Sequence, residues 1–187
     1  AWVHQSSFAQ DAAKDTPLRI SKTEDGIIVH RWMMDVEPAP FYKKVIGFSG
    51  NCDRLQHYEV RYPSHALIRA VFTPAGTGGV DGPLHDDVFI MDSLNFMTPV
   101  SEGETRYYWF QLRNIRPDDA ALSAMMTEDV QHAFEEDRAV LAEVQKGMSN
   151  KRTPHIDLPI DGGQLRFRRR LEAMIAEERA VDQKMQG

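Results

Sequence analysis

The sequence predicts an α+β domain, in which an antiparallel sheet packs against long helices on one side. Short segments rich in β-branched and aromatic residues, separated by turn signals, fill the first 113 residues. Segments with helical spacing of apolar residues fill most of the remainder. Because the strands precede the helices instead of alternating with them, the order favours α+β over a parallel α/β sheet.

The first predicted strand covers residues 26–34, which are mostly apolar and follow a turn at residues 24–26. Pro38 and Pro40 end this strand, because proline cannot donate a hydrogen bond to a neighbouring strand. The residues that follow, 41–47, are predicted to form a short helix.

A hairpin is predicted next. The side chains of residues 55–62 alternate between the two faces of a predicted strand, which ends at Pro63. Residues 66–73 form its partner strand, and a glycine-rich loop follows over residues 74–83.

The strongest strand signals are residues 88–97 and 105–113, joined by a turn at residues 101–104. Aromatic residues stand on both faces of the segment 106–112, so we expect both faces to contact apolar groups.

Two helices complete the chain. Asp118 or Asp119 can cap a helix that continues to about Lys146, with a break near Thr127. Gly147 is a suitable stop for that helix. A polar connection that contains proline precedes a last helix over residues 164–182.

Composition narrows the function classes. The chain has 187 residues, and we expect residues 1–187 to form a single domain. A net charge of −6 argues against nucleic acid and anionic membranes as partners. No apolar run reaches the roughly 18 residues of a membrane span. The single cysteine, Cys52, excludes an intrachain disulfide and favours a cytoplasmic compartment.

One acid breaks the pattern of the long helix. Asp137 lies at the centre of an apolar stripe, whereas its charged neighbours fall off that stripe. A carboxylate buried there must be protonated, paired or bound to a metal. Periodicity alone leaves two readings open: a structural acid in an ion pair, or a catalytic carboxylate or metal ligand. The stripe consists of Ala133, Phe134, Val140, Leu141 and Val144.

The segment around this acid, residues 134–145, resembles the C-terminal helix of Rieske oxygenase α-subunits of the vanillate-demethylase and phthalate-dioxygenase type. In that family the aspartate of a Glu-Asp pair is a ligand of mononuclear iron, so the resemblance implies that Asp137 is this ligand. Residues 95–99 followed by 105–109 are similar to the family's hairpin of a Thr-Pro pair, a short turn and an aromatic run.

The N-terminal residues 2–8 are similar to the end of the family's ligand motif, Asp-x-x-His-x-x-x-x-His. His4 matches the second histidine of that motif. The first histidine would lie before Ala1, and we expect the natural protein to be longer because the chain begins abruptly.

The resemblance implies a helix-grip (START/Bet v 1-like) fold and a catalytic site at mononuclear Fe(II), held by two histidines and one aspartate. It also implies a [2Fe-2S] Rieske cluster in an N-terminal domain absent from this chain, which has too few cysteines to hold one. Implied partners are O₂, a small aromatic substrate and a reductase or ferredoxin that passes on electrons from NAD(P)H. The implied assembly is a homotrimer, and the isolated chain is expected to be inactive.

Strand alternation supplies candidates for the substrate pocket, with each strand's set on one face of that strand. These candidates are Phe89, Met91, Asn95, Trp109 and Gln111. Asn95 stands where many relatives carry a histidine that contacts substrate, so the pocket chemistry is expected to differ.

Two other functions stay open. The chain can be a non-enzymatic module of helix-grip shape that binds an apolar ligand without metal, in which case Asp137 should pair with an arginine. It can also be a partner subunit of an oxygenase that has no Rieske domain and serves assembly. Iron bound at His4 and Asp137 would distinguish the oxygenase from both.

Overall fold

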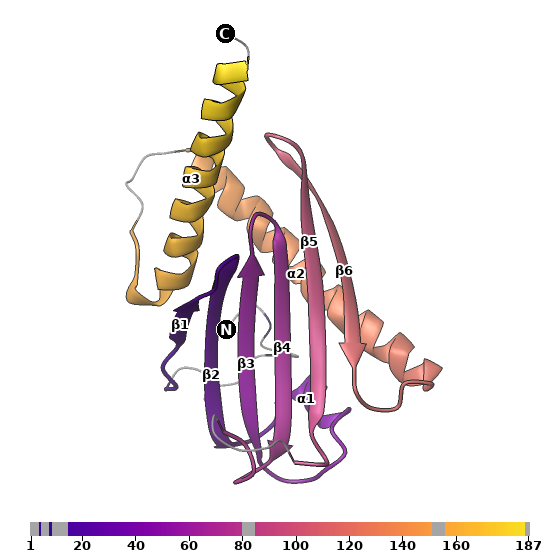
Figure 1. Cartoon of the computed structure of the whole chain (residues 1–187). Coiled ribbons are helices and arrows are strands. Elements are labelled where there is room, and N and C mark those ends of the chain that lie inside the picture. Colours follow the sequence, from indigo (N-terminus) through magenta and orange to yellow (C-terminus); the bar gives the residue numbers. More distant parts are fainter. Residues whose placement is uncertain (1–3, 5–7, 9–14, 80–84, 151–155, 186–187) are drawn as a thin grey trace.

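The computed structural model describes residues 4, 8, 15–79, 85–150 and 156–185. Six antiparallel strands form one sheet in the order β1-β2-β3-β4-β5-β6, so each strand pairs with its sequence neighbours. Figure 1 shows this curved sheet with the long helix α2 crossing behind it and α3 beside the β1–β2 edge. The strands are β1 Arg19–Lys22, β2 Gly26–Val36, β3 Cys52–Arg61, β4 His65–Pro74, β5 Phe89–Ser101 and β6 Glu104–Arg113.

The predicted sheet and its two hairpins are confirmed. β3 and β4 pair along their whole length, from Arg61↔His65 to Cys52↔Pro74. Pairing of Ser101 with Glu104 places the turn between β5 and β6 where it was predicted. The strand β1 was not predicted, because it is short, polar and at the edge of the sheet.

The helices are α1 Pro40–Lys43, α2 Ala120–Ser149 and α3 Gly162–Met185, with a 3₁₀ turn at Pro159–Asp161 before α3. Asp119 caps α2, because its side chain accepts a hydrogen bond from the Leu122 amide at 2.9 Å.

Three details of the predicted helices were wrong. The long helix does not break at Thr127 but runs without interruption from Ala120 to Ser149, and the threonine hydroxyl donates to the Ser123 carbonyl at 2.8 Å within it. Gly147 does not stop the helix, which continues to Ser149. The short helix predicted over 41–47 ends at Lys43, where two buried aromatic residues have already anchored it to the core.

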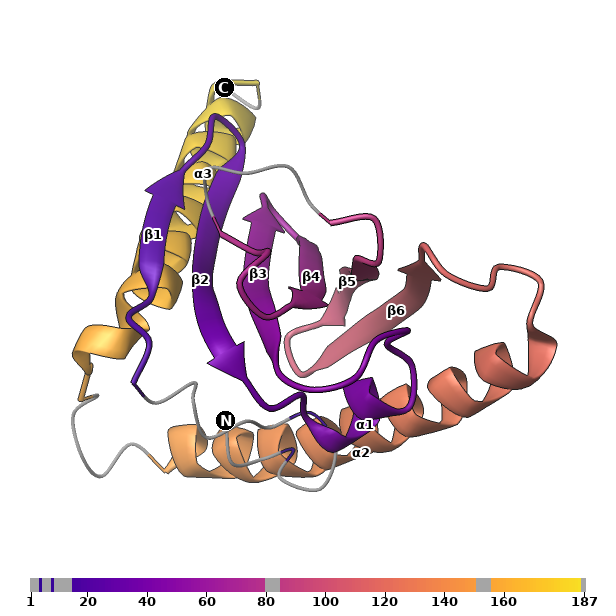
Figure 2. The ribbon, with the colours of Figure 1, turned by 90° about the horizontal axis from the view of Figure 1, so that it is seen from below.

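The core lies between the inner face of the sheet and the first half of α2 (Figure 2). α2 buries Leu122, Met126, Val130 and Ala133 at helical spacing. The sheet and α1 supply the fully buried aromatic residues Phe41, Phe72 and Phe89. Burial alternates along β5, where Phe89, Met91, Ser93 and Asn95 face inward.

The apolar stripe of α2 is covered only in its first half. Beyond Ala133, the described chain leaves Val140, Leu141 and Val144 exposed at 44%, 64% and 48%. The prediction that Asp137 is buried in this stripe was therefore wrong, since 43% of its side-chain surface is exposed. The sheet covers only the N-terminal half of α2, and the apolar stripe continues along the helix beyond the sheet.

The N-terminus of α3 packs closely against the sheet edge. A Cβ atom on Gly163 would lie 2.7 Å from the Val29 side chain, and Phe167 stacks on Tyr62 with ring centroids 5.6 Å apart. Val29 and Ile20 are paired residues, and both contact this end of α3. No helix among the described residues is long and apolar enough to cross a membrane.

Candidate functional site

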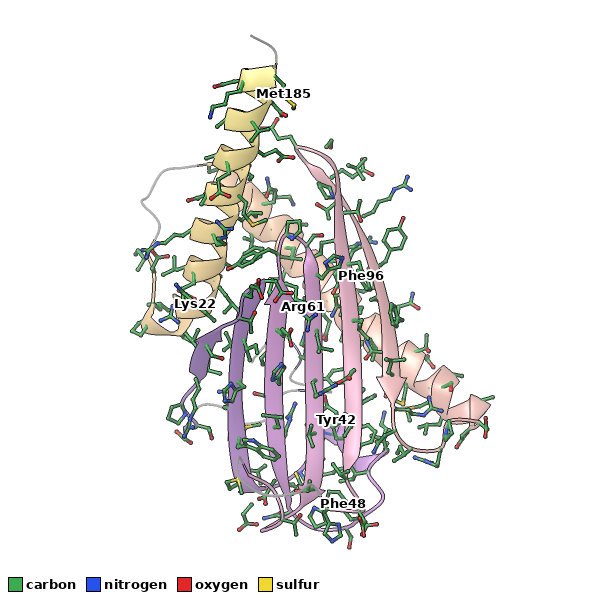
Figure 3. All side chains as sticks on the ribbon, in the orientation of Figure 1. Lys22, Tyr42, Phe48, Arg61, Phe96 and Met185 are labelled. Atoms are coloured by element: carbon green, nitrogen blue, oxygen red, sulfur yellow. The ribbon has the colours of Figure 1, made fainter. Side chains whose placement is uncertain are left out.

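A cavity of about 270 Å³ lies between the inner face of the sheet and α2. The strands supply mostly polar side chains, and α2 supplies mostly apolar ones. Tyr42, labelled in Figure 3, enters the wall from α1. The lining residues are His4, Phe8, Arg31, Tyr42, Arg54, Gln56, Tyr58, Ile68, Arg69, Ala70, Met91, Ser93, Gln111, Val130, Ala133, Phe134 and Asp137.

His4 and Asp137 meet in the wall of this cavity, although 133 positions separate them in the sequence. The Nε2 atom of His4 lies 3.2 Å from Oδ1 of Asp137, and its Nδ1 atom lies 2.9 Å from Oε2 of Glu136. Phe8 links His4 to the core, because its ring packs on Phe41 with centroids 4.5 Å apart and its amide donates a hydrogen bond to the His4 carbonyl.

The imidazole of His4 therefore faces a carboxylate oxygen with each of its two nitrogens. A neutral imidazole has one N–H group, so it can satisfy only one of these contacts as a donor. In the other contact, the lone pair of the unprotonated nitrogen faces a lone pair of the carboxylate oxygen. This contact is favourable only if the ring carries a second proton or a cation lies at that nitrogen. Nδ1 makes the shorter contact, with Glu136, which leaves Nε2 and the Asp137 carboxylate as a pair of atoms that suits a cation.

The spacing of this pair fits the donor set expected for iron. Two ligand atoms at about 2.1 Å from a metal, in adjacent positions, are about 3 Å apart. The 3.2 Å separation between Nε2 of His4 and Oδ1 of Asp137 is close to that value. Among the described residues, no group of three or more histidine, cysteine or acidic side chains could hold a metal ion, so this pair alone would be an incomplete ligand set.

A polar network runs along β5 and β6 beside the cavity. The Tyr107 hydroxyl donates to Oδ1 of Asn95 at 2.6 Å, and Nε2 of Gln111 donates to the Ser93 hydroxyl at 2.8 Å. Burial, and to a lesser extent the charge of Asp137, raises the pKa of Tyr107. The Oε1 atom of Gln111 is buried and accepts no hydrogen bond from the described residues, so it is available to a ligand that donates one.

The structure places the five predicted pocket residues on the inner face of the sheet, but not all at the cavity. Met91 and Gln111 line it. Phe89 is completely buried in the core, and Asn95, which is 2% exposed, bonds to Ser93 and Tyr107 instead. Trp109 packs edge-on against Phe134 of the cavity wall, with ring centroids 5.1 Å apart.

Sequence reasoning missed the basic part of the cavity. Arg31 and Arg54 line it from β2 and β3, and Gln56 accepts a hydrogen bond from Arg31 at 2.7 Å. One signal was present, because Arg31 interrupts a run of apolar residues in a predicted strand. Arg54 and Phe8 carried no comparable signal.

Known proteins resemble this chain over nearly its whole length. It is 30% identical over 192 residues to a vanillate O-demethylase oxygenase subunit from Pseudomonas sp., covering 100% of this chain and 58% of the relative. It is 28% identical over 182 residues to the toluene-4-sulfonate monooxygenase system iron-sulfur subunit of Comamonas testosteroni, covering 95% of this chain and 52% of the relative.

The fold is also that of a solved oxygenase. Dicamba monooxygenase bound to 3,6-dichlorosalicylic acid superposes with a TM-score of 0.83 at 18% identity, over 96% of this chain and 52% of that one. This likeness confirms the predicted helix-grip arrangement of a curved sheet on long helices. The chain thus spans little more than half the length of these relatives.

The sequence pattern of one family matches residues 1–177, a range that includes both His4 and Asp137. That match covers most of the chain and agrees with the relatives and the fold. The chain therefore belongs to the family of vanillate O-demethylase oxygenase C-terminal domains.

Proposed function

We propose that this chain is the catalytic domain of a Rieske-type oxygenase, which activates O₂ at mononuclear Fe(II) and hydroxylates or demethylates a small aromatic compound. The observation that carries the proposal is the contact between His4 and Asp137 at a cavity, within a domain of this family. The relatives' names support an oxidoreductase that incorporates oxygen.

His4 and Asp137 would hold the iron, and a further histidine would complete the set of two histidines and one carboxylate. If the family's ligand motif holds here, that histidine would lie before Ala1. When bound by such a set, Fe(II) keeps open coordination positions, at which it can activate O₂ next to a substrate.

The other residues of the site have simpler roles. Glu136 accepts a hydrogen bond from Nδ1 of His4 and so turns Nε2 towards Asp137. Val130, Ala133 and Phe134 give the α2 side of the cavity an apolar surface, which would contact an aromatic ring and exclude water.

The remaining parts of the system would lie outside this chain. A [2Fe-2S] Rieske cluster would pass on electrons that a reductase or ferredoxin takes from NAD(P)H, within a cytoplasmic homotrimer. The isolated chain would then be inactive, because its single buried cysteine cannot hold such a cluster.

A second candidate is a metal-free module that binds a ligand in the same cavity. The exposure of Asp137 favours it, since a carboxylate that is 43% exposed can be stable without a metal. However, such a module was expected to pair Asp137 with an arginine, and the structure pairs it with His4.

Turnover by the native subunit separates the two candidates. With reductase, NAD(P)H and a panel of aromatic substrates, we expect product that contains oxygen from ¹⁸O₂. Asp137→Ala should abolish that product, whereas Glu135→Gln should retain it, because Glu135 is a neighbouring exposed acid that pairs with Arg138. Product formation by the Asp137→Ala protein would exclude the proposed iron site.

A further inference from the structure

The first half of α3 is strongly basic. Residues 162–171 contain four arginines and no acidic residue, within a chain whose net charge is −6. Residues 172–185 contain four acids and two cations, so the two halves of the helix carry opposite net charge. The helix dipole favours the reverse order, with acids near the N-terminus and cations near the C-terminus. Helix stability therefore does not account for this arrangement.

Three of these arginines have no ionic partner in the part of the chain that the structure describes. Arg166, Arg168 and Arg169 are exposed, and their guanidinium groups form no ion pair or hydrogen bond with any described residue. The fourth, Arg170, pairs with Glu177 at 3.2 Å. The first half of α3 thus presents positive charge that the described residues do not neutralise.

The cations gather on one side of α3 and on the strand beside it. Arg166, Arg169 and Arg170 are three and four residues apart, a spacing that places them on one face of a helix. A Cβ atom on Gly162 would lie 3.1 Å from a side chain of β1, so α3 begins alongside this strand (Figure 1). Lys22, the last residue of β1, adds an exposed cation there (labelled in Figure 3). We call Lys22, Arg166, Arg169 and Arg170 the basic surface.

Exposed aliphatic residues flank the basic surface. Leu158 and Ile160, just before α3, are 57% and 65% exposed, and Ile175 on α3 is 38% exposed. Arginine is enriched at protein–protein interfaces, where it lies among apolar side chains. A nucleic acid or an anionic membrane would instead meet the repulsion of a chain with a net charge of −6. The occupant that fits this surface is therefore a protein with an acidic face.

We infer that the basic surface binds an acidic face of the electron-donor protein. This inference rests on the proposed function, in which a reductase or ferredoxin supplies the oxygenase with electrons. Opposite charges would speed the encounter of the two proteins, and the exposed aliphatic residues would add apolar contact in the complex. Because the cations are exposed to solvent, their effect should weaken as the salt concentration rises.

Binding of the native subunit to its electron-donor protein tests the inference without requiring turnover. Biolayer interferometry measures the association rate and Kd at about 50 and 200 mM salt. Arg166→Glu combined with Arg169→Glu should raise Kd about tenfold at the lower salt concentration, chiefly through slower association. The affinity of the unaltered subunit should fall as the salt concentration rises, and that of the variant should change less.

Two further variants separate charge at this surface from charge elsewhere. Arg179→Glu combined with Lys184→Glu is the matched control, because it makes the same change of charge in the other half of α3 and should leave Kd unchanged. Arg166→Lys combined with Arg169→Lys, which keeps the charge, should bind the donor nearly as well as the unaltered subunit. All four side chains are exposed, so the variants should fold, and their melting temperatures check this.

An unchanged Kd for the Arg166→Glu, Arg169→Glu variant, or no binding of the donor by the unaltered subunit, would overturn the inference. Equally tight binding of a DNA duplex or of phosphatidylserine vesicles would also overturn it, because the surface would then select polyanions in general. A failure of the proposed function has a different signature: the donor protein binds at the basic surface, but the native subunit holds no mononuclear iron.

Discussion

His4 donates a hydrogen bond to Glu136, with 2.9 Å between Nδ1 of the imidazole and Oε2 of the carboxylate. Glu136 precedes Asp137, so one turn of α2 supplies both an orienting group and a candidate ligand. Because Nδ1 is occupied by Glu136, Nε2 is the nitrogen directed to Asp137. The sequence pattern had given a role only to Asp137, as a metal ligand, and this contact adds an orienting role for Glu136.

Glu136→Gln should weaken Fe(II) binding to the native subunit by about 10- to 100-fold, because an amide is a poorer acceptor for the imidazole N–H. Anaerobic titration with Fe(II) measures the change. Glu135→Gln, the adjacent control, should bind iron like the unaltered protein. Equal affinities for the two variants would show that Glu136 does not position His4.

Gly26→Ala should destabilise the fold by about 3 kcal/mol or more, because the added Cβ would lie 2.1 Å from the Val60 carbonyl oxygen of the neighbouring strand. Gly47→Ala is the control, since its Cβ would meet no atom within 4 Å. Urea denaturation measures both free energies of unfolding. A loss of less than 1 kcal/mol at Gly26 would mean that β2 and β3 separate there at little cost.

Cys52 should make the stability fall in alkaline solution. Its side chain is completely buried, and burial raises the pKa of the thiol from 9.0 to about 11. A pKa that is higher in the folded state favours folding below the unfolded value, and this contribution is lost as the pH rises from 9 through 11. The difference between a pKa of 9.0 and one of about 11 corresponds to roughly 3 kcal/mol.

Denaturation of the unaltered and Cys52→Ala proteins at pH 7.5, 9 and 10.5 measures that contribution. The difference between their free energies of unfolding should shrink as the pH rises. A difference that stays constant over this range would show that the thiol titrates normally in the folded protein.

The exposed half of the α2 stripe should be an assembly surface. Leu141 and Val144 are 64% and 48% exposed, and a continuous apolar stripe of this kind is costly in water. Leu141→Asp with Val144→Asp should reduce the mass of the native assembly, measured by light scattering, without lowering its melting temperature by more than a few degrees. Glu143→Gln is the control, because Glu143 is an exposed polar residue of the same part of α2. This substitution should leave the assembly intact.

The main elements of the fold were predictable because their signals are local. Alternation and turns located the strands of both hairpins, and helical spacing located α2 and α3. The burial of α2 was not predictable beyond Ala133, because the pattern that predicts an apolar face cannot show how far the sheet extends over it. The short polar strand β1 depends on pairing with β2, which a local pattern does not reveal.

The site was predictable in part. The family resemblance selected His4 and Asp137, and the fold brings them to 3.2 Å, but whether they bind iron stays a prediction. The partnership of His4 with Glu136 and the juxtaposition of Arg31 and Arg54 depend on tertiary geometry. Strand alternation put Phe89 and Asn95 on one face of their strand without showing which way that face points. The structure turns it inward, where Phe89 packs in the core and Asn95 accepts a hydrogen bond from the Tyr107 hydroxyl.

The iron content of the native gene product, before and after Asp137→Ala, tests the central claim most directly. We expect about three irons per subunit, two from the cluster and one from the mononuclear site, and about two in the variant. The variant should remain folded, because the Asp137 side chain is 43% exposed. An unchanged iron content after the substitution, or a native protein without mononuclear iron, would contradict the account and leave Asp137 as a structural acid.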